Sequence, residues 1–463
     1  MSEAPAKFVT GSLMRHVTVM SLTSSVGIMA VFLVDFIDMV FIAMLGKAEL
    51  AAAIGYAGSI LFFTTSFSIG MAIAVGALVA RSLGAGDMAA ARARSSHGLI
   101  YGVGFGSAFA LFVWLNIPLF VGWIGAEGET ATLAEGYLRI IVPSLPFLVV
   151  GMMGGGILRA HGDARRAMMA TIYGGGVNAV LDPILIFGFG LDLTGAALAS
   201  VAARVVIGVT ALVPILRHHG GLPRADLAGM ARDFVPLVTI GFPAILTQLA
   251  TPVGQAIVTR SMAQYGLEAV AGMAIVGRLM PVSFAVIFAL SGAVGPILGQ
   301  NYGAGRGDRV RRGFNAALIF AGGVIVVIAA VLFGLRGVIV DLLDATGVTR
   351  DLVYLFCGPL ALLFFFNAVL FVANAAFNNL GHPFYSTWMN WGRNTVAMVP
   401  LVWVCATLFG APGVLIGQSL AGVVFGVIAW VLARRVIAQG GAAGPRDSFA
   451  REGRLLSLLN LRK

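Results

Sequence analysis

The chain has 463 residues, of which 59% are hydrophobic and only 11% are charged. A soluble globular protein carries roughly 25% charged residues, so this composition leaves too few polar side chains to cover a surface that faces water. It excludes a large soluble domain and indicates a protein that crosses the membrane many times. Because a spanning helix takes about 20 apolar residues, the length accommodates roughly twelve spans.

Apolar runs separated by charged or turn-rich clusters divide the chain into twelve predicted helices. The runs are 16–45, 50–80, 96–123, 130–158, 166–190, 194–216, 234–262, 268–299, 313–342, 349–379, 384–409 and 412–436. We therefore predict an all-α polytopic membrane protein with both termini on one side. The N-terminus has no short apolar core followed by a cleavage site, so we expect it to be a cytoplasmic lead-in that is retained.

The distribution of basic residues predicts the orientation. The loops and tails on the side of the termini hold 22 of the 30 Lys and Arg residues, whereas the opposite loops hold four basic and nine acidic residues. By the positive-inside rule both termini are cytoplasmic, in a bacterial inner membrane. The net charge of +10 is therefore an orientation signal, and we expect no nucleic-acid partner. The basic tail either lies on anionic lipid or is simply solvated.

An internal repeat organises the chain. The segment Leu83-Gly84-Ala85-Gly86 recurs 219 residues later as Tyr302-Gly303-Ala304-Gly305, and Glu49 with Glu268 and Gly162 with Gly381 share that offset. It predicts two six-helix lobes related by a pseudo-twofold axis along the membrane normal, with a midplane site where they meet. The predicted divisions are a cytoplasmic N-terminus (1–15), an N-terminal lobe (16–217), a cytoplasmic linker (218–233), a C-terminal lobe (234–436) and the basic tail (437–463).

Acidic side chains inside predicted spans are costly and indicate function. All three lie in the N-terminal lobe with polar neighbours, and the set is Asp35, Asp38, Asn178, Asp182 and Ser200. Asp35 and Asp38 share one helix face, as do Asn178 and Asp182. A desolvated carboxylate that takes up and releases a proton near neutral pH would be an ion-coupling site. Alternatively, Arg204 forms a structural ion pair with Asp182.

The C-terminal lobe is polar without acids. Its candidates for a substrate cavity are Gln248, Thr251, Gln255, Arg278, Asn367, Asn374, Trp391 and Arg393. The alternative interpretation of such residues is hydrogen bonding between helices. Cys357 and Cys405 lie in apolar runs and are expected to be core residues. The loop histidines His161, His218 and His219 have no Cys or Glu at ligand spacing, so we expect them to be solvated and predict no metal site or cofactor.

Several segments together resemble one transporter family. VDFIDMVFIAMLGKAELAA (34–52), GQNYGAGRGD (299–308) and NAVLDPILIFGFG (178–190) are similar to signatures of the multidrug and toxic compound extrusion (MATE) transporters. The resemblance covers about residues 14 to 436. It implies an antiporter in which Asp38 takes the place of the coupling aspartate and Asn178 and Asp182 match a polar pair in the fifth helix. Ser200 stands where threonine is usual, and Asp35 is extra to the pattern.

One departure from the family bears on the coupling ion. Sodium-driven NorM-like members carry a glutamate and an aspartate where this chain has Thr251 and Asn367, so the chain is more similar to the DinF-like branch. This favours H⁺ as the coupling ion, although a Na⁺ site at Asp38, Asn178 and Asp182 stays open. Hard oxygen ligands suit either ion.

The resemblance implies a secondary active multidrug efflux antiporter and not an enzyme. We expect it to export amphipathic cations, drugs or metabolites, in exchange for H⁺ by alternating access, as a monomer among membrane lipids. The alternatives are a Na⁺-coupled antiporter, a lipid-linked precursor flippase and an exporter of anionic metabolites, which Arg204, Arg278 and Arg393 would suit. A major facilitator transporter is disfavoured because the loop LGAGDMAAARAR has no Asp- and Arg-rich signature.

Overall fold

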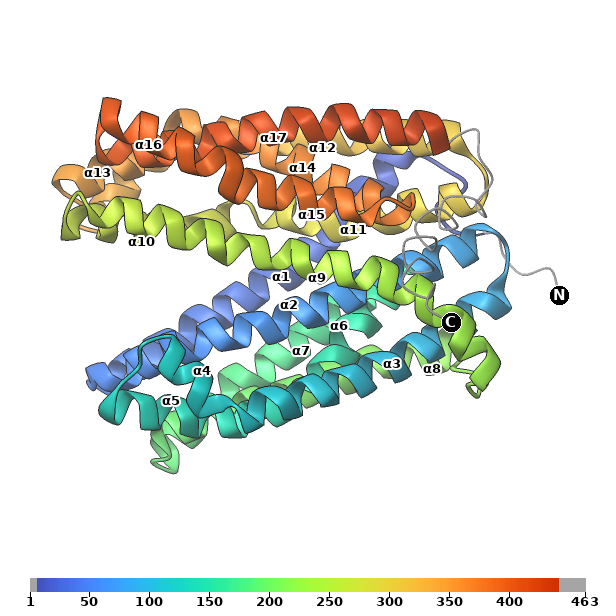
Figure 1. Cartoon of the computed structure of the whole chain (residues 1–463), viewed down its shortest axis with the longest axis horizontal. Coiled ribbons are helices and arrows are strands. Elements are labelled where there is room, and N and C mark those ends of the chain that lie inside the picture. Colours follow the sequence, from blue (N-terminus) through green and yellow to red (C-terminus); the bar gives the residue numbers. More distant parts are fainter. Residues whose placement is uncertain (1–5, 441–463) are drawn as a thin grey trace, which may run out of the picture. The chain divides into compact units, whose positions relative to one another are not determined.

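A computed structural model describes residues 6–440, and every regular element in that range is helical (Figure 1). The first half contains α1 (Leu13–Met44), α2 (Ala48–Gly84), α3 (Met88–Leu115), α4 (Ile117–Trp123), α5 (Gly128–Ile141), the 3₁₀ segment η1 (Val142–Ser144), α6 (Leu145–Ala160), α7 (Ala164–Pro183), the π-helical segment η2 (Ile184–Gly188) and α8 (Asp192–His218).

The second half follows the same order. It contains α9 (Leu227–Ala263), α10 (Leu267–Ser283), α11 (Ala285–Gly303), α12 (Gly307–Leu342), α13 (Gly347–Leu355), the π-helical segment η3 (Phe356–Leu360), α14 (Ala361–Asn379), α15 (Pro383–Trp391), the π-helical segment η4 (Gly392–Ala397), α16 (Met398–Phe409) and α17 (Ala411–Gly440).

The helices are long and apolar enough to cross a membrane. Within the described range, eleven segments meet this test singly, and the pair α10 and α11, bent by 49°, makes a twelfth. The predicted polytopic fold with twelve spans is therefore confirmed. The basic tail (437–463) lies, from residue 441 onward, outside the described residues.

Prolines lie at breaks in four of the predicted helices. The segment 268–299 contains Pro281; its first part, α10, ends at Ser283, and its second part, α11, begins at Ala285. Proline has no N–H to donate and its ring clashes with the preceding turn, which kinks or breaks a helix. The span 130–158 likewise contains the 3₁₀ segment around Pro143, Pro183 is followed directly by a π-helical segment, and Pro359 lies in η3. Each of the four remains one membrane span, with α10 and α11 as a bent pair.

The internal repeat extends to the starts of the helices. Pairs of helices that begin 219 residues apart are α2 and α10, α3 and α12, α5 and α13, α7 and α15, and α8 and α17. The turn before the third span is the same in both copies, since Gly86 and Gly305 have φ of +76° and +68°. Glycine adopts this left-handed conformation without a steric penalty. The two halves are thus one structural unit used twice.

Packing divides the chain into two compact units. The first unit is formed by Val26–Leu83 and Asp87–Gly241, and the second unit by the described residues before Val26, Gly84–Gly86 and the described residues from Phe242 onward. Both α1 and α9 therefore contribute to each unit. The predicted lobe boundaries at 16–217 and 234–436 stay a prediction.

Glycine allows close helix contacts within the first unit. A Cβ on Gly156 of α6 would lie 2.8 Å from the carbonyl oxygen of Ala72 on α2, and a Cβ on Gly174 of α7 would meet the side chain of Ile207 on α8. Small residues let helix backbones approach closely in membranes, where packing is a main source of stability. The helices that carry the polar groups of this unit are therefore fixed against one another.

The segment before α1 is bound to the second unit. The backbone N–H of Phe8 donates to Gln300 Oε1 at 2.8 Å, and Asn301 Nδ2 donates to Phe8 O at 3.0 Å. Arg309 of α12 donates to the carbonyl oxygens of Phe8 and Gly11, each at 3.1 Å. Phe8 itself is fully buried. The residues that we predicted only as a lead-in thus form part of the fold.

Candidate functional site

Three polar side chains meet inside the first unit, and we call them the acid cluster: Asp38 of α1 with Asn178 and Asp182 of α7. Asn178 Nδ2 lies 3.1 and 3.3 Å from the two carboxyl oxygens of Asp38 and 2.6 Å from Asp182 Oδ2. The spacing of four residues places Asn178 and Asp182 on one face of α7. The structure thus brings together the three residues that the sequence singled out most strongly.

Two members of the acid cluster are buried, Asp38 is half-buried, and the cluster has no basic partner among the described residues. Asp182 is 1% exposed and Asn178 5%, and Asp182 Oδ1 is buried without a hydrogen-bond partner among the described residues. No Lys or Arg of residues 6–440 forms an ion pair with either carboxyl. Both carboxyl groups accept from the same amide nitrogen, which places the two acids next to each other.

The alternative role for Asp182, an ion pair with Arg204, is not formed in this structure. Arg204 Nη1 instead donates to the carbonyl oxygen of Ile141 at 3.1 Å and to Ser144 Oγ at 3.0 Å. Ser200, one turn earlier on α8, hydrogen-bonds to Tyr137 of α5. Arg204 therefore joins α8 to the 3₁₀ break between α5 and α6.

Tyr137 is a residue that the sequence analysis missed. Its side chain contacts Ser200 and lies close enough to Arg204 and to the acid cluster to interact electrostatically with them. Tyr137 lies on α5, whereas Asp38 lies on α1 and Asp182 on α7. The spacing of residues along one helix therefore does not predict that Tyr137 lies near them. Asp35 is exposed on α1 and takes no part in the hydrogen bonds of the acid cluster, although it interacts electrostatically with Asp38.

A second polar group lies in the second unit, and we call it the arginine cluster: Arg393 of η4, Asn394 beside it, and Asn367 of α14. Arg393 Nη1 donates to Asn367 Oδ1, and Nη2 donates weakly to Asn394 Oδ1 at 3.4 Å. The Nε atom is buried and has no acceptor among the described residues. Both partners are neutral amides, so the charge of the guanidinium is not balanced by a carboxylate.

No hydrogen bond among the described residues links the remaining cavity candidates to this cluster. Trp391 Nε1 donates to the carbonyl oxygen of Leu246 at 2.9 Å and so joins α15 to α9. Asn374 is buried, and its Oδ1 has no partner in the described part of the chain. The others are half-buried or exposed on α9 and α10: Gln248, Thr251, Gln255 and Arg278. Their assignment to a substrate cavity stays a prediction.

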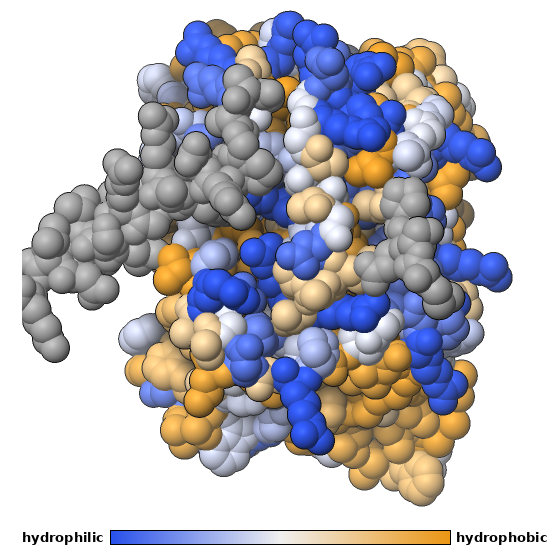
Figure 2. Space-filling model, turned by 90° about the vertical axis from the view of Figure 1, so that its right-hand side faces the viewer, coloured by the Kyte–Doolittle hydropathy of each residue, from blue (hydrophilic) through white to orange (hydrophobic). Residues whose placement is uncertain are grey.

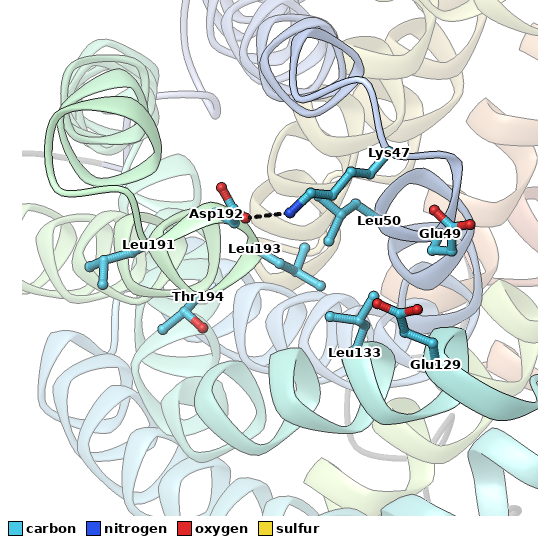
Figure 3. Close-up of a pocket in the computed structure, with 9 residues that line it drawn as sticks. All are labelled: Lys47, Glu49, Leu50, Glu129, Leu133, Leu191, Asp192, Leu193 and Thr194. Carbon is cyan, nitrogen blue, oxygen red and sulfur yellow. Dashed lines mark hydrogen bonds and ion pairs between the residues drawn. The ribbon is translucent and has the colours of Figure 1, made fainter.

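A separate pocket lies at the end of the first unit where α4 and α5 are found (Figures 1 and 3). Lys47 Nζ forms an ion pair with Asp192 Oδ2 at 3.1 Å, and Glu49 and Glu129 line the same pocket. Lys47 and Asp192 are partly exposed, which limits the strength of their pair. The ion pair ties the turn after α1 to the start of α8.

The turn between α6 and α7 contains a compact ionic group. Asp163 Oδ2 accepts hydrogen bonds from Arg166 Nη1 at 2.6 Å and from His219 Nε2 at 3.1 Å, and the rings of His161 and His219 lie 4.5 Å apart. Burial alone would raise the pKa of Asp163, but the hydrogen bonds from His219 and Arg166 hold it below its usual value. Burial lowers the pKa of His161 to about 4. The expectation that both histidines are solvated was wrong.

A buried histidine joins α3 to the start of α9. His97 Nδ1 lies 2.8 Å from Asp233 Oδ2, and both side chains are almost fully buried. Arg94 Nε approaches the other oxygen of Asp233 at 3.5 Å, and Arg94 Nη1 donates to Ser82 Oγ at 2.6 Å. The sequence analysis missed this contact, because 136 residues separate His97 from Asp233.

These features define a class of protein. Twelve apolar spans built from a repeated unit, with carboxyl groups buried at membrane depth, are typical of secondary transporters. The MatE family profile matches residues 24–184 and 243–404, and the chain belongs to the MatE family. It is thus a multi-pass membrane transporter of small-molecule compounds and not an enzyme, as the sequence predicted.

Two named relatives are similar in sequence to this chain over nearly its whole length. A protein named FAD transporter from Shewanella oneidensis is 28% identical over 90% of this chain and 93% of its own length. The multidrug export protein MepA from Staphylococcus aureus is 24% identical over the same shares. A MOP superfamily transporter structure from Pyrococcus furiosus has a TM-score of 0.88 at 21% identity, covering 96% of this chain and 100% of its own.

Proposed function

We propose that this transporter exports amphipathic organic compounds in exchange for H⁺, and that the acid cluster is the coupling site. The observation that carries the proposal is the placement of Asp38 and Asp182 on one amide, that of Asn178, with neither carboxyl paired with a base among the described residues. Two adjacent carboxylates in apolar surroundings repel each other, and uptake of a proton relieves the repulsion. A cluster of this kind binds and releases protons as its access to water changes.

The orientation of Asn178 supports H⁺ over Na⁺. Its amide N–H groups are directed at the carboxyl oxygens of Asp38 and Asp182, whereas a cation site would present the amide oxygen. The orientation of an amide follows from its hydrogen bonds, and here both carboxyl groups are acceptors. The buried Oδ1 of Asp182 is a second acceptor at which a proton can reside.

The proton enters from outside and leaves to the cytoplasm, opposite to the substrate. We place both termini in the cytoplasm and the chain, as a monomer, in a bacterial inner membrane, on the strength of the basic loops. Figure 2 looks onto the end of the helices at the right of Figure 1, and hydrophilic side chains gather there while hydrophobic ones cover most of the lower part of the same view. Basic residues on this face would contact lipid headgroups.

A second candidate function is export of a metabolite. The relative named FAD transporter is more similar in sequence to this chain than the MepA relative is, at 28% against 24% identity. The family default of cationic substrates suits the carboxylates of the first unit. It does not account for the uncompensated charge of Arg393 in the second unit.

The test is uptake of a fluorescent organic cation and of FMN into everted membrane vesicles, under a pH gradient and separately under a Na⁺ gradient. We expect transport to follow the pH gradient and Asp38→Asn to abolish it. Asp351→Asn, an exposed acid on α13, is the matched control and should transport normally. Full pH-driven transport by Asp38→Asn would refute the coupling assignment, and transport driven by Na⁺ alone would reverse the choice of ion.

A further inference from the structure

The arginine cluster is an unusual arrangement inside a membrane helix. Arg393 lies in the π-helical segment η4, about midway between the start of α15 at Pro383 and the end of α16 at Phe409. A guanidinium is always charged, and burying a charge without a counter-ion in a span is costly. Such a charge persists only where something offsets the cost.

The protein itself satisfies this guanidinium only in part. Of its five N–H groups, one donates to Asn367 and one weakly to Asn394, and the Nε–H has no acceptor. The edge formed by Nε and Nη2 is therefore under-satisfied. Arg204 of the first unit differs, because its Nη1 donates to a carbonyl oxygen and a hydroxyl at 3.1 and 3.0 Å and none of its nitrogens is a fully buried atom without a partner among the described residues.

The surroundings hold the amides of the arginine cluster in place. A Cβ on Gly254 of α9 would contact the side chain of Asn394, and one on Gly422 of α17 would lie 3.2 Å from Asn367 Nδ2. Both amides are thus packed against neighbouring helices. Asn394 is buried and Arg393 is half-buried, with its Nε atom buried. A ligand that reaches this guanidinium therefore meets amides that are already fixed, and it reaches Nε only when the surrounding helices move.

We propose that the arginine cluster binds an anionic group, a carboxylate or phosphate, of the transported compound. A planar guanidinium forms two parallel hydrogen bonds to such a group, and an ion pair in apolar surroundings supplies the missing negative charge. This inference rests on the proposed function, export of a small organic compound. It assigns the substrate class: amphipathic compounds that carry a carboxylate or phosphate group.

The test uses ligand pairs that differ by one phosphate. Purified protein in phosphatidylcholine nanodiscs is titrated with FMN and riboflavin, and with AMP and adenosine, with no ion gradient present. We expect at least one phosphorylated member to bind about tenfold or more tightly than its neutral partner, as expected for a charged hydrogen-bonded pair. Arg393→Gln should remove the preference and leave riboflavin and adenosine binding unchanged. Arg260→Gln, which removes an exposed arginine of α9 in the same unit, is the control.

Three outcomes would overturn the proposal. They are the lack of a preference in both pairs, a preference that survives Arg393→Gln, and loss of the preference in phosphatidylglycerol nanodiscs, which would make a lipid headgroup the ligand. Arg393→Lys keeps the charge without the planar fork, and we expect a weakened preference, so the test holds even if Arg393→Gln unfolds. Because binding is measured without a gradient, failure here is separate from failure of coupling at Asp38.

Discussion

The two repeats share their helix starts but differ in the polar cluster that each carries. At the offset of 219 residues, Asn178 and Asp182 correspond to Ala397 and Leu401, and Asp38 to Ile257. Conversely, Arg393 and Asn394 correspond to Gly174 and Gly175. Neither repeat thus carries the cluster of the other. One fold used twice holds the acid cluster in one copy and the arginine cluster in the other, and our proposals assign proton coupling to the first cluster and recognition of an anion to the second.

The largest expected effect is on coupling. Asp182→Leu installs the residue of the second repeat and removes one carboxyl of the acid cluster. Without a second carboxyl, no proton needs to be shared with Asp38, so pH-driven efflux should fall to the level of vesicles without the protein. Leu401→Asp, the reverse exchange, should not restore it. Uptake into everted vesicles measures transport by both variants. pH-driven transport by Asp182→Leu would contradict the proposed division of roles between the repeats.

The next effect concerns the buried contact between α3 and α9. Asp233→Ala leaves His97 without its partner and Arg94 with one hydrogen bond fewer, and we expect a loss of about 3 kcal/mol in the free energy of unfolding. The second repeat has Ala316 at the position of His97, so the contact belongs to the first repeat alone. Denaturant titration in detergent measures the loss, with Asp226→Ala in the preceding linker as a control that should change stability less.

A smaller effect is a dependence of stability on pH that we expect in the first repeat and not in the second. In the turn after α6, His161, Asp163 and Arg166 correspond to Leu380, His382 and Tyr385, and the rings of His382 and Tyr385 stack at 5.3 Å. The pKa of His161 is about 4 in the folded chain and about 6.5 in an unfolded chain, so the unfolded state binds more protons between these values. Stability is therefore full above pH 6.5 and falls as the pH drops towards 4.

Two variants check this dependence. Lowering the pH from 7 to 5 should cost the wild type about 2 kcal/mol through His161, and His161→Leu should lose that dependence. The contribution of Asp163, whose folded pKa is depressed, is lost only at lower pH, below its usual value. Tyr385→Leu should weaken the equivalent turn equally at both pH values. Thermal unfolding in detergent at pH 7 and 5 measures these differences, and an unchanged slope in His161→Leu would contradict them.

The smallest effect concerns Tyr137. Tyr137→Phe removes the hydroxyl that contacts Ser200, which should cost about 1 kcal/mol of stability and reduce pH-driven efflux several-fold. Tyr173→Phe, an exposed tyrosine on α7, should change neither quantity. Wild-type transport by Tyr137→Phe would confine the proton pathway to Asp38, Asn178 and Asp182.

The sequence predicted what depends on local pattern. Apolar length defined the spans, and the four-residue spacing of Asn178 and Asp182 placed them together, while the match of Asp38 to a family signature identified their partner. Contacts between distant elements left no such pattern. Tyr137 reaches Ser200 from another span, His97 binds an acid 136 residues away, and Arg204 proved to bind a backbone carbonyl. These pairs form only when the helices pack together, so a local sequence pattern does not predict them.

The anchoring of residues before α1 has a consequence for how the chain can be divided. Phe8 is held by Gln300, Asn301 and Arg309, so a fragment ending in the linker near Pro223 carries a piece of the second unit. The fragment that begins there carries the first part of α9, which belongs to the first unit. If the gene were cut between the two repeats, each product would lack a segment supplied by the other. The halves of the sequence are thus not the halves that fold, and co-expressed fragments should be stable only as a pair.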